Sequence, residues 1–170
     1  MKVLNLFGYT GMATLFAAEA GAQVTHVDAS KKAVIWAKTN QEISGLQEKT
    51  IRWIVDDALK FVKREAHRQK AYDAIVLDPP KFGRGPNGEV WEFYKYLPSL
   101  LQACEEILSP QASFLLLTAY AVKASALTLL RATQERLHAH GGIITAGELV
   151  QQETSSKKYL SRAIYALWEK

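Results

Sequence analysis

The sequence predicts an α/β fold with a largely parallel sheet that has helices on both faces. Short apolar runs alternate with amphipathic stretches along the whole chain of 170 residues. The last two apolar runs are separated only by the polar loop at positions 151–159. Because so short a loop joins antiparallel neighbours, we expect the final strand to run against the others.

The composition is that of one soluble globular domain spanning residues 1–170. Hydrophobic residues make up 48% of the chain and charged residues 22%, which excludes disordered, collagen-like and coiled-coil proteins. No run reaches the roughly 18 apolar residues that a membrane span needs. The apolar stretch at the N-terminus is too short for a signal peptide, so we expect a cytoplasmic protein with no membrane partner.

Each expected strand is an apolar run that ends in a turn or in a charged residue. A glycine turn follows the first run, and Asp28 and Asp78 follow the second and the fourth. The expected strands are Val3–Phe7, Gln23–Val27, Ile51–Val55, Tyr72–Leu77, Ser113–Thr118, Ile143–Val150 and Leu160–Trp168.

The stretches between the strands have helical spacing. Ser30 is expected to cap the second helix, in which Ala33, Ile35 and Trp36 lie on or near the apolar stripe. Pro98 is expected to split the fourth helical stretch into a short and a longer helix. Residues 81–89 are read as a polar, glycine-rich loop. The expected helical stretches are Gly11–Ala20, Ser30–Ile43, Asp57–Gln69, Trp91–Leu108 and Ala124–His138.

Ligands of open α/β sheets bind at the carboxyl ends of the strands, so the residues that follow each strand are the candidates for a site. Gly8 and Gly11 allow a tight turn and a close approach of the backbone to a ligand. Asp28 follows Gly8 by 20 residues, the spacing at which a carboxylate meets ribose hydroxyls. Asp57 is expected both to cap a helix and to point toward an adenine ring. The ligand should therefore contain a nucleoside.

The first turn argues against a dinucleotide. A dinucleotide fingerprint counted from Gly8 needs a glycine at position 10, where this chain has Thr10. That glycine lets a pyrophosphate approach the backbone. A nucleoside cofactor without phosphates, such as S-adenosylmethionine, fits better.

The most specific motif is Asp78-Pro79-Pro80-Lys81-Phe82, directly after the fourth strand. Two prolines fix the direction of the backbone and donate no N–H. We therefore expect the Asp78 carboxylate and nearby carbonyl oxygens to accept hydrogen bonds from a target amine or ring edge. Phe82 offers a stacking face for a planar base.

The motifs NLFGYTG, HVDAS, VDDA, LDPPKF and LLLTAY together resemble those of the class I S-adenosylmethionine-dependent methyltransferases. More narrowly, DPPKFGRGPNGEVW with LPSLL and ILSP resembles the bacterial group related to the 23S rRNA cytosine-5 methyltransferases. The resemblance covers essentially the whole chain. It implies a Rossmann-like seven-stranded sheet of order 3-2-1-4-5-7-6 with the last strand antiparallel, S-adenosyl-L-methionine as cofactor, and methylation of RNA, notably rRNA.

The resemblance and the residues at the strand ends together give the expected site. The residues expected to bind the cofactor are Phe7, Gly8, Tyr9, Thr10, Gly11, Asp28, Ser30, Asp56, Asp57, Ala58 and Asp78. The residues expected to face the substrate and to serve catalysis are Asp78, Pro79, Pro80, Lys81 and Phe82.

The chain departs from this group in two ways. Cytosine-5 methylation uses a cysteine that attacks the base, yet the stretch after the fifth strand reads Thr118-Ala119-Tyr120. Cys104, the only cysteine, falls on an apolar helical stripe and is expected in the core. The group also has an N-terminal RNA-binding or substrate region ahead of the first strand, whereas this sequence begins two residues before the expected strand at Val3. We therefore expect such a region, or a homodimer, to cover an apolar patch beside the cofactor crevice.

The charge of the chain permits a polyanionic partner without requiring one. Lysine and arginine number 21 and aspartate and glutamate 17, a net charge of +4. Lys81, Arg84, Lys157 and Lys158 are expected to form a rim that contacts phosphates. His138-Ala-His140 has no third ligand nearby, so no metal site is expected.

Other functions fit parts of the same pattern. A small-molecule methyltransferase and a nicotinamide oxidoreductase use related sheets. A nucleoside-binding or RNA-binding module that has kept the fold without turnover is the non-enzymatic alternative, given the missing cysteine.

Overall fold

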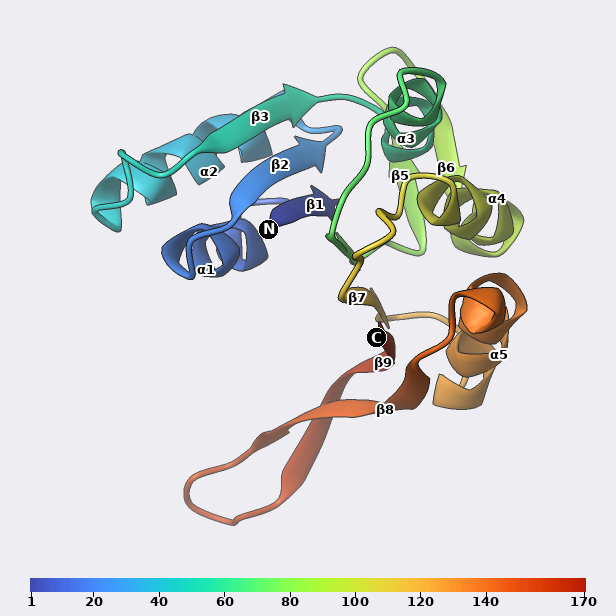
Figure 1. Cartoon of the computed structure of the whole chain (residues 1–170). Coiled ribbons are helices and arrows are strands. Elements are labelled where there is room, and N and C mark those ends of the chain that lie inside the picture. Colours follow the sequence, from blue (N-terminus) through green and yellow to red (C-terminus); the bar gives the residue numbers. More distant parts are fainter.

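The computed structural model describes all 170 residues and contains a seven-stranded sheet. The spatial order is β3-β2-β1-β4-β7-β9-β8. Counted in chain order within this sheet, it is the predicted 3-2-1-4-5-7-6. All neighbouring strands pair in parallel except β9, which runs antiparallel to both β7 and β8 (Figure 1). The strands are β1 Lys2–Leu6, β2 Gln23–Asp28, β3 Ile51–Val55, β4 Ala74–Leu77, β7 Phe114–Ala119, β8 Ile143–Gln152 and β9 Tyr159–Glu169.

Five helices cover the sheet unequally. Helices α1 and α2 pack on one face, against β1, β2 and β3, and helices α3, α4 and α5 pack on the other (Figure 1). On the face that α1 and α2 cover, β7, β9 and β8 carry no helix. The helices are α1 Met12–Glu19, α2 Lys31–Ile43, α3 Ala58–His67, α4 Phe93–Glu105 and α5 Ala126–Leu137, followed by a short 3₁₀ turn, η1 His138–His140. The predicted caps of α2 and α3 are present: Ser30 accepts from the Ala33 amide at 3.2 Å, and Asp57 accepts from the Lys60 amide at 2.9 Å.

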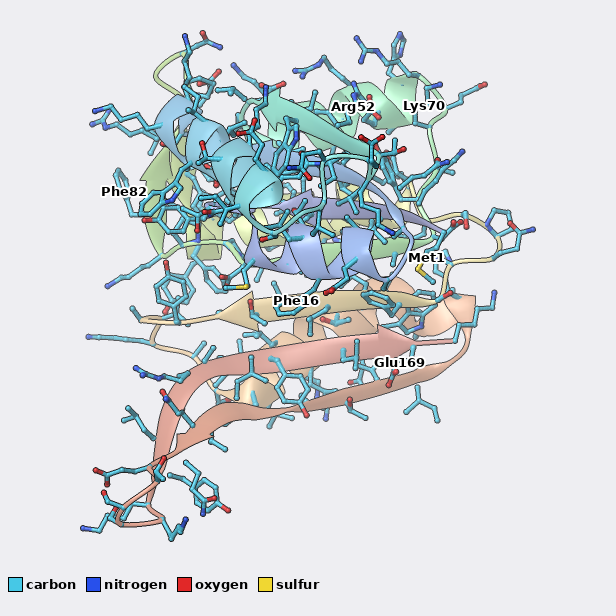
Figure 2. The ribbon with its side chains drawn as sticks, turned by 90° about the vertical axis from the view of Figure 1, so that its left-hand side faces the viewer. Met1, Phe16, Arg52, Lys70, Phe82 and Glu169 are labelled. Atoms are coloured by element: carbon cyan, nitrogen blue, oxygen red, sulfur yellow. The ribbon has the colours of Figure 1, made fainter.

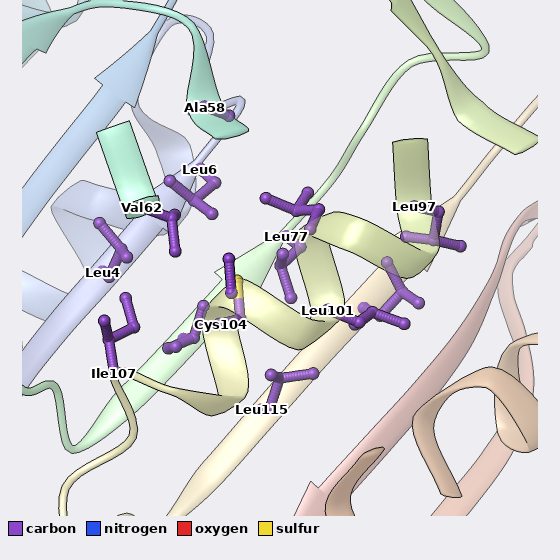
Figure 3. Close-up of a cluster of buried hydrophobic side chains, with 14 of the residues drawn as sticks. Leu4, Leu6, Ala58, Val62, Leu77, Leu97, Leu101, Cys104, Ile107 and Leu115 are labelled. Atoms are coloured by element: carbon purple, nitrogen blue, oxygen red, sulfur yellow. The ribbon is translucent and has the colours of Figure 1, made fainter. Parts of the chain in front are cut away.

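The main core lies between the sheet and α3, α4 and α5. It is a cluster of 25 buried residues, and a cluster of four lies under α1 on the opposite face. Leu4 and Leu6 belong to the large cluster and Val3 to the small one, as the alternation of side chains along a strand requires. Figure 3 shows Cys104 on α4 among the apolar side chains of the large cluster, which confirms its expected core position.

Two predictions about helices are wrong. Helix α4 runs unbroken through Pro98, because Leu97 and its neighbours Leu100 and Leu101 are buried and hold both sides of the proline to the core. In α2, Ile35 and Trp36 are exposed instead of facing the core. The helix approaches the sheet with its smaller residues, and the buried ones are Ala33, Val34 and Ala37.

The predicted loop at 81–89 is also partly wrong, because it is the centre of a β-hairpin. Strands β5 (Phe82–Arg84) and β6 (Val90–Glu92) pair antiparallel outside the main sheet. Trp91, expected on the helical stripe, lies in β6 and is 4% exposed. The hairpin lies above the carboxyl edge of the sheet and contributes to the site described below.

Two exposed apolar side chains lie beside the carboxyl edge. Met12 and Phe16 on α1 are 69% and 64% exposed. Figure 2 looks onto this face and shows Phe16 next to the strands that carry no helix. No helix is long and apolar enough to span a bilayer.

Candidate functional site

A cavity of about 310 Å³ opens at the carboxyl edge of the sheet. Its walls come from the segments that follow β1, β2, β3, β4 and β7, and from the β5–β6 hairpin. Residues far apart in the chain therefore meet at one place, as expected for the crevice of an open α/β sheet. The lining residues are Phe7, Tyr9, Val27, Asp28, Ala29, Ser30, Asp56, Asp57, Ala58, Asp78, Pro80, Gly83, Arg84, Gly85, Trp91 and Tyr120.

The loop after β1 has a strained backbone. Phe7 and Tyr9 have φ angles of 58° and 47°, a left-handed conformation that is unusual for residues with side chains. The loop is held by bonds to the neighbouring strand, where the Gly8 amide donates to the Val27 carbonyl at 3.1 Å. Strain of this kind is typical of ligand-binding segments that the surrounding structure fixes.

The two glycines of this loop form the predicted tight turn, in which the Gly11 amide donates to the Gly8 carbonyl at 2.9 Å, and both are also needed for packing. A Cβ atom at Gly8 would collide with the ring of His26 on β2. Gly11 has a φ of +91°, and a Cβ there would lie 3.0 Å from the Cβ of Ala37. Gly8 and Gly11 thus let the loop approach β2 and α2, and neither lines the cavity.

Asp28 is the most firmly positioned carboxylate of the cavity. Oδ2 accepts from the Tyr9 amide and Oδ1 from the Ser30 amide, both at 2.8 Å. Each carboxylate oxygen has a second lone pair, so Asp28 can still accept two hydrogen bonds from a ligand. Two acceptors fixed at the end of β2 suit a pair of neighbouring hydroxyl groups.

Asp56 and Asp57 have different partners. Asp56 accepts from the Asp57 amide at 2.8 Å and forms an ion pair with Arg64, so it mainly positions α3. Asp57 uses only Oδ1 to cap α3. Its other oxygen has no protein partner and remains available beside Ala58 in the cavity.

The Asp78-Pro79-Pro80-Lys81-Phe82 segment divides between the cavity, the core and the surface. Asp78 and Pro80 line the cavity, and the Asp78 carboxylate accepts from the Thr118 hydroxyl at 2.6 Å. Pro79 is buried, so the prediction that it faces the substrate is wrong. Lys81 and Phe82 lie outside the cavity on the surface; Phe82 is 55% exposed at the edge seen in Figure 2.

One predicted acceptor is already used within the protein. The carbonyl of Pro80 accepts from the indole nitrogen of Trp91 at 2.7 Å. The same indole packs against Phe7 with ring centroids 4.9 Å apart. Trp91 therefore joins the hairpin to both the loop after β1 and the segment after β4. Asp78 uses only Oδ1 for Thr118, so its Oδ2 remains without a protein partner.

The hairpin is tied to α3 by an ion pair. Lys60 on α3 donates to Glu89 at 2.6 Å, and the Asn87 amide donates to the same carboxylate at 2.8 Å. The hydrogen bond from Lys60 lowers the pKa of Glu89 to about 2. This contact holds Gly83, Arg84 and Gly85 over the cavity.

The expected site left out several lining residues of the cavity, namely Val27, Ala29, Trp91, Tyr120 and the hairpin glycines. Tyr120 follows β7 at the carboxyl edge, so its place in the fold could have identified it. Trp91 gave no such signal, because it belongs equally well to an apolar helical stripe. Arg84 was expected only on the rim.

A second hollow of about 390 Å³ adjoins the cavity on the far side of Phe7. The predicted residues Gly8, Thr10 and Gly11 line this hollow together with Met12 and Phe16. Phe7, Tyr9 and Asp78 line both spaces. Asp78 therefore stands where the two hollows meet.

The only thiol of the chain does not reach the site. Cys104 is fully buried in α4, and burial raises the pKa of its thiol far above the usual range. A buried neutral thiol is a poor nucleophile. No group of three or more metal-ligating side chains occurs anywhere in the chain.

Three comparisons bear on this geometry. The model of the family described as Conserved hypothetical protein 95 matches residues 1–91. The chain is 38% identical over 111 residues to the ribosomal RNA large subunit methyltransferase K/L of Shewanella baltica, a match of 64% of this chain and 15% of that protein. It is 51% identical to a SAM-dependent methyltransferase of Agrobacterium tumefaciens in a solved structure, with a TM-score of 0.97 over 99% of this chain and 56% of that one.

More distant structures share the fold. A protein of Streptococcus mutans, described as a candidate SAM-dependent methyltransferase, is 21% identical with a TM-score of 0.72 over 98% of this chain and 44% of that one. The sheet order and these matches identify the class I methyltransferase fold. The chain spans about half the length of the Agrobacterium protein and about one seventh of the Shewanella protein.

Proposed function

This chain belongs to the Conserved hypothetical protein 95 family, and we propose that it is an S-adenosylmethionine-dependent methyltransferase that acts on RNA. The observation that carries the proposal is the arrangement of two carboxylates at the carboxyl edge. Asp28 presents fixed acceptors at one end of the cavity, and Asp78 lies where the cavity meets the second hollow. The RNA substrate is supported by the Shewanella relative, which is named as a ribosomal RNA methyltransferase.

The residues of the cavity fit the nucleoside part of this cofactor. A volume of about 310 Å³ lies at the small end of the range of ligand sites. Asp28 would accept from the ribose hydroxyls, and the free oxygen of Asp57 would accept from the adenine amine. Phe7 and Ala58 supply apolar walls for the ring. The second hollow, with Gly8, Thr10 and Gly11, would take the amino-acid part.

Acidic side chains dominate the charge of the cavity. Asp28, Asp57 and Asp78 have no basic side-chain partner, whereas Asp56 is paired with Arg64. Carboxylates favour a ligand that carries positive charge. A sulfonium-bearing cofactor matches this charge better than a dinucleotide, whose pyrophosphate is anionic.

When bound, S-adenosylmethionine supplies an electrophilic methyl group that an acceptor lone pair can displace in line. The task of the protein is to align the acceptor, and positioning of this kind can contribute roughly 7–11 kcal/mol to lowering a barrier. Asp78, held by Thr118, would accept from a donor group of the substrate and orient it. Pro80 fixes the wall beside it, and Tyr120 and Phe82 offer aromatic faces for a base.

The chain lacks the nucleophile that cytosine-5 methylation requires. Carbon 5 of cytosine becomes reactive only after a thiolate adds to the ring. Cys104 is buried in the core, and no cysteine lines the cavity. We therefore propose that the acceptor is an atom with its own lone pair, a nitrogen or an oxygen. A proton released after transfer would go to the Asp78 carboxylate or to water.

Transfer of a tritiated methyl group into total bacterial RNA, followed by mass spectrometry of the nucleosides, tests this function. The expected result is a single methylated nucleoside with the new methyl on nitrogen or oxygen. Asp78→Asn should reduce turnover at least tenfold while leaving cofactor affinity within about threefold, because only the reacting complex needs that contact.

The matched control is Asp73→Asn, which changes a carboxylate at the opposite edge of the sheet. It should leave turnover unchanged at a temperature where both variants are folded. Methylation of small molecules but not of RNA would refute the RNA part of the proposal. Tight binding of NAD in place of S-adenosylmethionine would refute the proposal as a whole.

A further inference from the structure

Strands β8 and β9 extend beyond the main sheet as a free ribbon. Strand β7 ends at Ala119, opposite Ile164, so residues 159–163 of β9 pair only with β8. This free part of β9 is about 16 Å long at roughly 3.3 Å per residue. Figure 1 shows the ribbon projecting away from the body of the protein. An isolated two-stranded ribbon is marginally stable in water, so its exposed surface is suited to a partner.

The free part of the ribbon carries an excess of positive charge. Lys157 and Lys158 lie in the turn and Arg162 lies on β9, whereas Glu153 is the only acid of this part. Glu153 accepts from the Ser156 hydroxyl within the turn. Arg162 donates only to the neutral side chain of Gln151, at 2.9 Å from Nε, so no carboxylate neutralises it.

A third hollow connects the ribbon to the site. It has a volume of about 220 Å³ and lies between the loop after β7 and residues 161–164 of β9. Tyr120 lines both this hollow and the cavity. The loop is anchored, because the Lys123 amide donates to the Tyr94 hydroxyl at 2.5 Å. The surface is therefore continuous from Asp78 past Tyr120 to Arg162.

Basic and aromatic side chains both occur along this edge. The exposed aromatic residues at the site and on the ribbon include Phe82, Tyr94, Tyr120 and Tyr159, with exposed fractions of 55%, 53%, 49% and 69%. Arg84 lines the cavity, Arg162 lines the third hollow, and Lys123 lies in the loop after β7. Figure 2 shows the turn of the ribbon at the same end of the sheet as Phe82 and opposite Lys70. Cations together with exposed aromatic rings are typical of surfaces that bind single-stranded nucleic acid.

We propose that this surface binds the single-stranded RNA that flanks the acceptor nucleotide. The inference rests on the proposed function, because it extends the RNA from the acceptor at Asp78 along the ribbon. Lys157, Lys158 and Arg162 contact backbone phosphates, and Tyr159 stacks with a base outside the cavity. The ribbon thereby adds affinity without touching the cofactor.

The test compares charge reversals at the two edges of the sheet. The ribbon variant is Lys157→Glu with Lys158→Glu, and the control is Lys49→Glu with Lys70→Glu, which makes the same change at the amino edge. Binding of a labelled single-stranded RNA of mixed sequence is measured by fluorescence anisotropy over a range of salt concentrations. Affinity for S-adenosylhomocysteine is measured by calorimetry on the same samples.

The ribbon variant should bind RNA about tenfold more weakly. Its plot of log affinity against log salt should be shallower by about 1.4, which corresponds to two lost phosphate contacts. Its affinity for S-adenosylhomocysteine should match that of the wild type. Tyr159→Ala should weaken RNA binding roughly tenfold without changing the slope, because stacking releases no counterions. The amino-edge control should change none of these.

Equal RNA affinities of the ribbon variant and the control would overturn the inference. So would a shift from dimer to monomer in the ribbon variant with RNA binding retained, which would assign the ribbon to self-association. If the wild-type protein binds S-adenosylhomocysteine and no RNA, the ribbon inference and the RNA substrate fail together while the cofactor assignment stands. If the ribbon variant loses RNA affinity but the wild type binds no cofactor, only the methyltransferase proposal fails.

Discussion

At the scale of single residues, the proposed binding of the cofactor depends mainly on the Asp28 carboxylate. Two backbone amides fix it from behind, so a ligand meets it already oriented. Asp28→Ala should weaken binding of S-adenosylmethionine by about 1.5–3 kcal/mol, the contribution of hydrogen bonds to a charged group. Calorimetry measures this, with the exposed Glu48→Ala as control. Unchanged affinity in a folded Asp28 variant would remove this residue from the site.

His26 makes the stability of the site loop depend on pH. Its ring lies against Gly8, and Nδ1 is 2.8 Å from the Thr14 hydroxyl oxygen. The same oxygen accepts a hydrogen bond from the Asn5 side-chain amide at 2.8 Å. Because Asn5 donates to that hydroxyl oxygen, the hydroxyl proton can point to Nδ1, which leaves the ring proton on Nε2. Nε2 has no partner of good geometry. Burial lowers the pKa of His26 to about 4, an effect that the Tyr9 backbone opposes only in part.

This shift predicts a loss of stability at acidic pH. The unfolded chain binds a proton at His26 below pH 6.5, whereas the folded chain resists it until about pH 4, so stability falls as pH decreases between these values. At pH 4.5 the loss should be about 2 kcal/mol relative to pH 7.5. Urea unfolding at both values measures it. His26→Gln should show a smaller loss over the same interval, and an equal loss in both proteins would contradict the assignment.

At the scale of elements, the sequence predicted the strands and caps well because their signals are local. Ser30 and Asp57 cap helices with their own side chains, and the apolar runs that end at Val55 and Leu77 are both strands of the sheet. The β5–β6 hairpin could not be predicted in the same way. Its strands have three residues each and pack through Trp91 against Phe7, a contact that only the folded chain creates.

The face of α2 was mispredicted for a similar reason. Residue size favours Ile35 and Trp36 as core residues, whereas the packing distance at Gly11 selects Ala37. The candidate site shows the same difference between local signals, which the sequence reveals, and contacts that form only in the folded chain. Its carboxylates stand directly after strands and were found from the sequence, but the lining contributed by the hairpin was not.

Pro98 offers a test of the unbroken α4. A proline inside a helix lacks the amide that would bond to the carbonyl four residues earlier, here that of Tyr94. Pro98→Ala should restore this bond and gain up to about 3 kcal/mol. The more flexible unfolded chain offsets about 0.4–1 kcal/mol of that gain. The net increase in the free energy of unfolding should be about 2 kcal/mol by urea titration, and a decrease would show that the ring of Pro98 itself stabilises the helix.

At the scale of the whole molecule, the proposed cofactor-binding and substrate-binding residues lie on different halves of the sheet. The cavity residues assigned to the cofactor follow β1, β2 and β3, while Asp78 and Tyr120 follow the central strands β4 and β7. The ribbon of β8 and β9 continues from the other half. The antiparallel β9 makes this possible, because it allows a hairpin whose turn lies at the same edge as the site. Charge follows the same division, with carboxylates in the cavity and cations on the ribbon.

This division predicts two separate patterns of hydrogen exchange. Cofactor at 100 times its dissociation constant should stabilise the folded state by about 2.7 kcal/mol, and amides of β1, β2 and β4 that exchange only through global unfolding should slow about a hundredfold. Amides of the free ribbon exchange by local opening, since only one partner strand holds them. They should be unaffected by S-adenosylhomocysteine and slow when single-stranded RNA is added. Protection of the ribbon by the cofactor alone would show that the two halves act as one unit.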